Sequence, residues 1–304
     1  MKKFIDNLSN ENNFSIYSSF FRIFICIHLL KKILFTWQHK GLLFMDKSFY
    51  VSEKVGLISF FNIDTNFIHS NFQIFYFLYL LLIILFFFGI GKNFTAILLF
   101  IFYEFLQNLC PIILNGGDNL LKFILLYMIF INSYDYLAIK TKKTKNNELL
   151  LFNNFISNIG GYAICIHLCF VYFFSAIHKV HSELWFNGIA TYYTLSLERF
   201  RGTPINLELA KNYLFVNLST YGTILIELFY PCLIWFKRTK YIMIFLAIVL
   251  HSSIYIFMMI YDFQMVFIFV QGFFISNSTY RKIFYNLKNN QVIRKIQNRF
   301  KVKF

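Results

Sequence analysis

The sequence predicts an all-α integral membrane protein, a helical bundle with about eight transmembrane helices. Three observations predict this class: 58% of the 304 residues are hydrophobic and 22% are aromatic, only 14% are charged, and only 3 are prolines. Such a chain has too few polar and charged residues to form the surface of an ordinary water-soluble protein. Its apolar stretches, of about 15 to 22 residues, have the length that carries a helix across about 30 Å of hydrocarbon, except for the last and shortest.

Eight apolar stretches alternate with more polar segments along the chain. The predicted spans are 16–37, 72–91, 94–114, 119–138, 159–178, 219–236, 240–260 and 263–277. The segments between them are too short to form a separate soluble core, so we expect one transmembrane domain over 1–278, followed by a basic tail over 279–304. For this tail, an amphipathic helix on the inner leaflet and a solvated segment are both open interpretations.

Basic residues gather on one side of these spans. With the amino terminus inside, 18 of the 29 Lys and Arg residues fall in the inner segments. This excess predicts a protein of the cell membrane with both termini in the cytoplasm. The net charge of +15 comes from residues that flank spans, without the aromatic and basic pattern of a nucleic-acid module. We therefore expect the lipid bilayer, with its anionic headgroups, as the partner and no nucleic acid.

Several predicted spans carry polar or ionisable side chains, which are costly at membrane depth and should face the bundle interior. The fifth span has one polar face, on which His167, Ser175 and His178 fall together, with Lys179 beside it. The other spans contribute Arg22, His28, Lys31, Lys32, Glu104, Gln107, Asn108, Glu227 and His251. We expect these side chains to line one polar cavity. Alternatively, they only form hydrogen bonds between helices, with Glu227 neutralised by a basic group of the first span.

Lys179, at the outer end of the fifth span, is the sharpest candidate for chemistry. Partial desolvation favours a neutral amine, which can accept a proton or attack a carbonyl. His178 and His181 beside it favour the neutral form, whereas Glu183 favours the charged form. Alternatively, Lys179 extends its ammonium group to the membrane interface, where Trp185 is an anchor. The five cysteines have no paired spacing of the kind that holds zinc, so we expect no metal site.

Four blocks of the sequence occur together, and in the same order, in a known family. Block 175–195 contains Lys179, Trp185, Gly188, Ala190, Tyr192, Tyr193 and Leu195; block 114–130 contains Asn115 and Asp118; block 224–240 contains Glu227 and Pro231; block 248–257 contains His251; and Arg22 lies in the first span. On these residues the chain resembles the HTTM family. This is the membrane domain shared with vitamin K-dependent gamma-carboxylases and with the SdpB-like proteins of peptide-toxin maturation.

The resemblance implies an outward-facing active site in which Lys179 is the base. It implies catalytic support from His251 and Glu227. The substrate-binding candidates are Arg22, Asn115, Asp118, His167, His178 and Trp185. In the carboxylases the base deprotonates vitamin K hydroquinone, so the implied cofactor is a quinol of this kind. The chain lacks the β-rich region of animal-type carboxylases and is closer in size to the SdpB-like members. This implies a small secreted peptide and a partner maturation subunit.

Three functions remain open at this point. The first is a membrane enzyme that acts through Lys179 on a secreted peptide or a lipid-soluble quinol. The second is a non-catalytic assembly or maturation partner, in which the polar faces only hold the bundle together. The third, a transporter or channel, is disfavoured because the sequence shows no internal repeat and few Gly or Pro residues within the spans.

Overall fold

The computed structural model describes residues 2–45, 59–62, 64–139 and 146–289, and every regular element in these ranges is a helix. The predicted all-α class is therefore confirmed. The predictions that concern 46–58, 140–145 and 290–304 lie outside the described residues. They include part of the first outward segment, four inner lysines and most of the basic tail.

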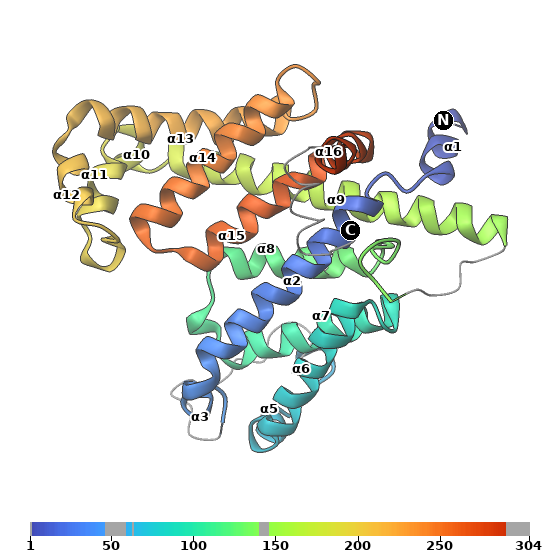
Figure 1. The fold of residues 1–304 in the computed structure, drawn as a ribbon. Coiled ribbons are helices and arrows are strands. Elements are labelled where there is room, and N and C mark those ends of the chain that lie inside the picture. Colours follow the sequence, from blue (N-terminus) through green and yellow to red (C-terminus); the bar gives the residue numbers. More distant parts are fainter. Residues whose placement is uncertain (1, 46–58, 63, 140–145, 290–304) are drawn as a thin grey trace.

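Eight helices correspond to the eight apolar stretches, and successive members run antiparallel (Figure 1). They are α2 (Ser15–Thr36), α6 (Phe72–Phe88), α7 (Lys92–Leu109), α8 (Gly116–Met128), α9 (Asn147–Val180), α13 (Tyr213–Leu233), α14 (Lys240–Met258) and α15 (Tyr261–Val270). The most extensive packing joins α9 to α13, and α8 packs against α7, α9 and α15.

Shorter helices lie at the two ends of this bundle (Figure 1). At the end where α2 and α9 finish, called here the site end, are α3 (Lys40–Phe44), α5 (Thr65–Ser70), α10 (Glu183–Phe186), α11 (Ala190–Ser196) and α12 (Ile205–Lys211). At the opposite end, called here the terminal end, are α1 (Lys2–Asn10) and α16 (Asn277–Asn289). Single 3-10 turns occupy Trp37–His39, Pro111–Ile113, Glu198–Phe200 and Gln271–Phe274.

Two of the described helices, α9 and α14, are long and apolar enough to cross a membrane, and α6 is apolar but shorter. By contrast, α8 has 13 residues and α15 has 10, which correspond to about 20 and 15 Å of helix. Both are shorter than the predicted spans 119–138 and 263–277. The described structure is therefore all-helical and contains two candidate membrane spans. The helix lengths do not show eight spans.

Arg22 binds the non-helical segment that follows α8. Its guanidinium group is fully buried, and its Nε and Nη2 atoms donate to the carbonyl oxygens of Ser133 (3.1 Å), Tyr136 (3.4 Å) and Leu137 (2.5 Å). The segment 133–137 therefore satisfies carbonyl groups without being helical. The Nη1 atom donates to the carbonyl oxygens of Phe86 (2.6 Å) and Phe87, at the negative end of α6. Every donor of the guanidinium group has an acceptor.

The start of α8 is a capping box that packs against α15. The side-chain oxygen of Asn115 accepts from the main-chain nitrogens of Gly117 (2.8 Å) and Asp118 (3.3 Å), and Asp118 Oδ2 accepts from the nitrogen of Asn115 (3.1 Å). A Cβ atom on Gly117 would lie 2.5 Å from the Cα atom of Phe263, which is main chain and has no rotamer to change. Glycine therefore allows α8 and α15 to approach closely.

We predict that Gly117→Ala destabilises the protein by about 1–3 kcal/mol, because the added methyl group overlaps the main chain of α15. The matched control is Gly222→Ala in α13, where no atom lies within 4 Å of the added Cβ. That change should be neutral or stabilising by up to about 1 kcal/mol, since alanine favours helix. Thermal unfolding in detergent measures both, and equal melting temperatures for the two variants would contradict the close approach.

Candidate functional site

A cavity of about 1070 Å³ lies at the site end, among α2, α9, α11, α13, α14 and α15. The chain segments that precede α8 and α15 form part of its wall, because both helices begin there. Five of the nine predicted site residues line it: Asn115, Lys179, Trp185, Glu227 and His251. Most other lining residues are aromatic or aliphatic. Of the polar side chains that the predicted spans contribute, Lys31, Ser175, Lys179, Glu227 and His251 line this cavity.

Lys179 and Glu227 form a mostly buried ion pair in this wall. The Nζ atom of Lys179 donates to Glu227 Oε1 (2.8 Å) and Oε2 (2.6 Å), and also to the Oγ atom of Ser175 (2.6 Å), one turn earlier on α9. The Trp185 ring centroid lies 5.1 Å from Nζ, in position for a cation–π interaction. The two charged side chains are 17% and 9% exposed, so the cavity gives limited access to them.

This geometry corrects two expectations for Lys179 and Glu227. Glu227 is neutralised by Lys179 of α9 and not by a basic group of the first span. Lys179 turns into the cavity and does not extend its ammonium group away from the bundle. Glu183, expected to compete for Lys179, is exposed on α10. The partner comes from α13 because α9 and α13 pack side by side, which is a tertiary relationship.

His251 belongs to a buried network of hydrogen-bonded side chains. Its Nδ1 atom bonds to the Oε1 atom of Gln264, and its Nε2 atom lies 2.7 Å from the hydroxyl oxygen of Tyr172. An amide oxygen can only accept, so Nδ1 carries a hydrogen and donates to Gln264. Gln271 donates to Tyr172 (3.1 Å) and accepts from Tyr230. These contacts hold the imidazole in one orientation within the cavity wall.

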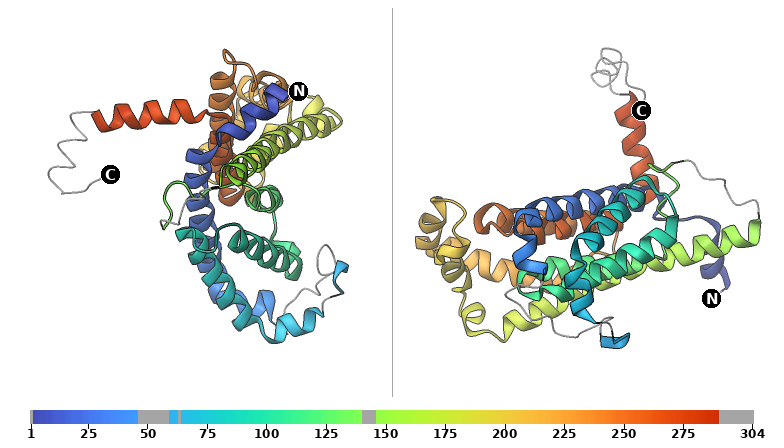
Figure 2. Two further views of the ribbon diagram at one scale, coloured as in Figure 1. Left: turned by 90° about the vertical axis from the view of Figure 1, so that its right-hand side faces the viewer. Right: turned by 90° about the horizontal axis from the view of Figure 1, so that it is seen from below.

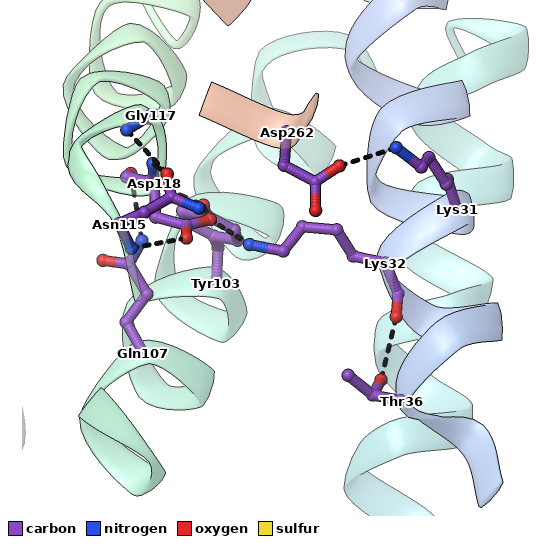
Figure 3. Close-up of polar contacts among 9 residues, drawn as sticks. All are labelled: Lys31, Lys32, Thr36, Tyr103, Gln107, Asn115, Gly117, Asp118 and Asp262. Carbon is purple, nitrogen blue, oxygen red and sulfur yellow. Dashed lines mark hydrogen bonds and ion pairs between the residues drawn. The ribbon is translucent and has the colours of Figure 1, made fainter. Parts of the chain in front are cut away.

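Asp118 belongs to a second polar cluster, which joins α2, α7 and α8 (Figure 3). Its Oδ1 atom accepts from Lys32 Nζ and from the hydroxyl group of Tyr103 (3.1 Å), and Oδ2 accepts from the nitrogen of Asn115. Gln107 donates to its main-chain oxygen at 3.0 Å. The Asp118 side chain is 2% exposed. The predicted substrate-binding Asp118 is thus fully engaged with protein partners, which is the geometry of a structural group.

Sequence reasoning missed one acidic residue of the cavity. Asp262, in the first turn of α15, accepts from Lys31 Nζ at 2.8 Å, and both residues line the cavity (Figure 3). The two side chains are 38% and 34% exposed, more than Lys179 and Glu227. A signal was present in the sequence: Asp262 is the only Asp or Glu that follows Glu227, and the first span carries two adjacent lysines that need partners.

Three predicted site residues lie away from the cavity. Arg22 binds carbonyl groups towards the terminal end. His167 faces α8, where its Nδ1 atom lies 3.1 Å from the hydroxyl oxygen of Tyr127, and His178 is exposed. The expected single polar face of α9 is therefore divided. The reason is that α9 has 34 residues and passes different neighbours along its length.

The described residues contain no group of three or more His, Cys, Asp or Glu side chains that could hold a metal ion. Comparisons with family models, with curated proteins and with solved structures find no match for this chain. The functional argument therefore depends on the cavity and the side chains in its wall.

We predict that Lys179→Met destabilises the protein by about 3 kcal/mol, because it leaves the buried Glu227 carboxylate without a counter-charge. The double variant Lys179→Met with Glu227→Leu should recover most of that loss, since no charge then remains buried. The control is Lys211→Met, which breaks an exposed pair with Glu208 whose side chains are 71% and 72% accessible, and should change stability little. Unfolding of all variants in one detergent measures the coupling, and additive losses would contradict it.

Proposed function

We propose that the chain is a multi-pass membrane protein whose eight main helices cross the bilayer, with the terminal end in the cytoplasm. The exterior supports this arrangement, because large apolar side chains are exposed on several helices, among them Leu34, Phe77, Phe170, Leu218 and Phe245. Such an apolar surface favours contact with lipid. The short α8 and α15 pack against each other and against longer neighbours, so protein covers part of their surface. Basic residues at the terminal end agree with the positive-inside rule.

This arrangement predicts which ends of the helices a membrane-impermeant maleimide can reach. With Cys232, the exposed native thiol, replaced by serine, Glu208→Cys on α12 should be labelled in intact cells. Arg238→Cys, between α13 and α14, should be labelled only after permeabilisation. Both positions are exposed, so accessibility within the fold is matched. Labelling of Arg238→Cys from outside would reject the orientation, and equal labelling of both in intact cells would reject the crossing.

We infer further that the cavity is an active site in which Lys179 and Glu227 move a proton of the substrate. One observation carries this proposal: a mostly buried ion pair lies in the wall of a cavity of about 1070 Å³. Transfer of the proton from Lys179 to Glu227 along their hydrogen bond produces a neutral pair. The free amine of Lys179 can then take a proton from the substrate, and the ammonium group that results stabilises the substrate anion.

The resemblance to HTTM proteins suggests a lipid-soluble quinol, such as vitamin K hydroquinone, and a small secreted peptide as the molecules involved. The residues fit a quinol, because Trp185 and Phe263 offer flat apolar surfaces in the same wall as the Lys179 amine. The volume is at the upper end of the usual range for small-molecule sites, about 300–1,000 Å³, which leaves room for a peptide side chain. Once bound, a quinol that reacts with oxygen supplies a base strong enough to remove a proton from glutamate before carbon dioxide is captured.

The test uses the purified chain in lipid nanodiscs with vitamin K hydroquinone, oxygen, labelled bicarbonate and a glutamate-containing peptide. We expect quinol consumption and label incorporation above those of empty nanodiscs. Loss of a proton-transfer group lowers rates by about 10²–10⁴-fold, so Lys179→Ala and Glu227→Gln should fall towards background. Lys211→Ala, exposed on α12 and outside the cavity, should keep full activity. If the unmodified chain does not exceed empty nanodiscs in either measurement, this activity is rejected and a non-catalytic maturation partner is favoured.

A further inference from the structure

Helix α16 leaves the bundle at the terminal end and contacts the other helices mainly through its first turns. Tyr280 stacks on Tyr17 at 5.3 Å between ring centroids, and its hydroxyl group donates to the carbonyl oxygen of Gly272 (2.9 Å). Arg281 forms an ion pair of 2.6 Å with Glu11. The rest of the helix extends away from the bundle, as both views of Figure 2 show. These contacts fix where α16 starts and leave its later turns uncovered.

The direction of α16 differs from that of the long helices. In Figure 1, α9 runs across the view, whereas α16 is seen nearly end-on. The hydrogen bonds of Asn277 to the carbonyl oxygen of Asn12 (2.8 Å) and to Ser15 Oγ (3.0 Å) place its start level with the beginning of α2. If α9 and α14 cross the bilayer as proposed above, α16 runs along the cytoplasmic membrane surface. The inference rests on that crossing.

One face of α16 is apolar and exposed. At about 100° per residue, Tyr280, Ile283, Phe284 and Leu287 fall within an arc of about 100°. The side chains of Ile283, Phe284 and Leu287 are 44%, 55% and 44% exposed. Tyr285 projects from the opposite face and is 69% exposed. An apolar stripe on a helix that leaves the bundle needs a partner outside the described fold.

The charge of this region identifies the partner. From residue 277 to residue 304 the sequence contains eight Lys or Arg residues and no Asp or Glu. Within α16 these are Arg281, Lys282 and Lys288, and they lie outside the arc of Ile283, Phe284 and Leu287. A helix with an apolar stripe and basic residues beside and opposite it binds at the boundary between headgroups and acyl chains, and basic clusters select anionic lipids. A protein groove would not require such an excess of one charge.

We propose that α16 is an interfacial helix that binds anionic phospholipids of the inner leaflet. Ile283, Phe284 and Leu287 enter the acyl-chain boundary, while the basic residues contact the headgroups. The stack of Tyr280 on Tyr17 links this surface helix to α2, the helix that carries Lys31 to the cavity.

The test places a tryptophan on each face of α16 in the full chain, as Phe284→Trp and Tyr285→Trp, in nanodiscs that contain brominated lipids. Bromine quenches tryptophan at acyl-chain depth, and the quenching of the unmodified chain is subtracted. We expect Phe284→Trp to be quenched at least about twofold more than Tyr285→Trp. The difference should increase when phosphatidylglycerol is mixed with phosphatidylcholine, and added salt should reduce that increase.

A second variant tests the headgroup contact separately. Lys282→Gln together with Lys288→Gln should measurably reduce the phosphatidylglycerol effect while leaving the quenching in pure phosphatidylcholine nearly unchanged. Equal quenching at the two tryptophan positions, or no response to phosphatidylglycerol, would overturn the proposal and favour a solvated tail or a protein partner. Failure of the proposed catalysis would leave these results unchanged, and an incorrect orientation would be detected independently by the maleimide labelling.

Discussion

The need to pair buried charges inside an apolar bundle is the constraint on which the rest of this structure depends. A charged group without a partner in such surroundings is costly, so each must meet an opposite charge or a set of carbonyl groups. Arg22 meets carbonyl groups of α6 and of the segment 133–137, Lys32 meets Asp118, and Lys179 meets Glu227. Each contact joins parts of the chain that are distant in sequence, and together they specify which helices are neighbours.

These charged groups differ in their surroundings. The surroundings distinguish a structural group, Asp118, from the candidate site pair of Lys179 and Glu227. Asp118 accepts from Lys32, Tyr103 and a main-chain nitrogen, and its side chain is almost completely buried. A buried carboxylate whose two oxygens both have protein partners stabilises the fold. Lys179 and Glu227 are also paired, but they lie in the wall of a cavity.

The cavity itself follows from the two short helices. Because α8 and α15 begin at the wall of the cavity, the irregular segments before them, together with α11, surround a space that no helix fills. The close approach of Gly117 to Phe263 keeps the starts of these helices together. At the terminal end, Arg22 binds main-chain carbonyl groups, and the basic helix α16 extends away from the bundle. One end of the bundle thus contains a cavity, and the other end carries a basic helix with exposed apolar side chains.

Local pattern in the sequence determined the all-α class and the positions of the main helices. An apolar run favours helix wherever it lies, so the predicted span 16–37 closely matches α2 at Ser15–Thr36. The cost of ionisable groups at membrane depth also marked Lys179, Glu227 and His251 as side chains that turn inward. Only the tertiary structure decided that Glu227 meets Lys179, that Asp262 meets Lys31, that His167 faces α8 and that Arg22 binds the segment after α8. These outcomes depend on which helices are neighbours and how each is rotated about its axis, and periodicity within one helix carries information on neither.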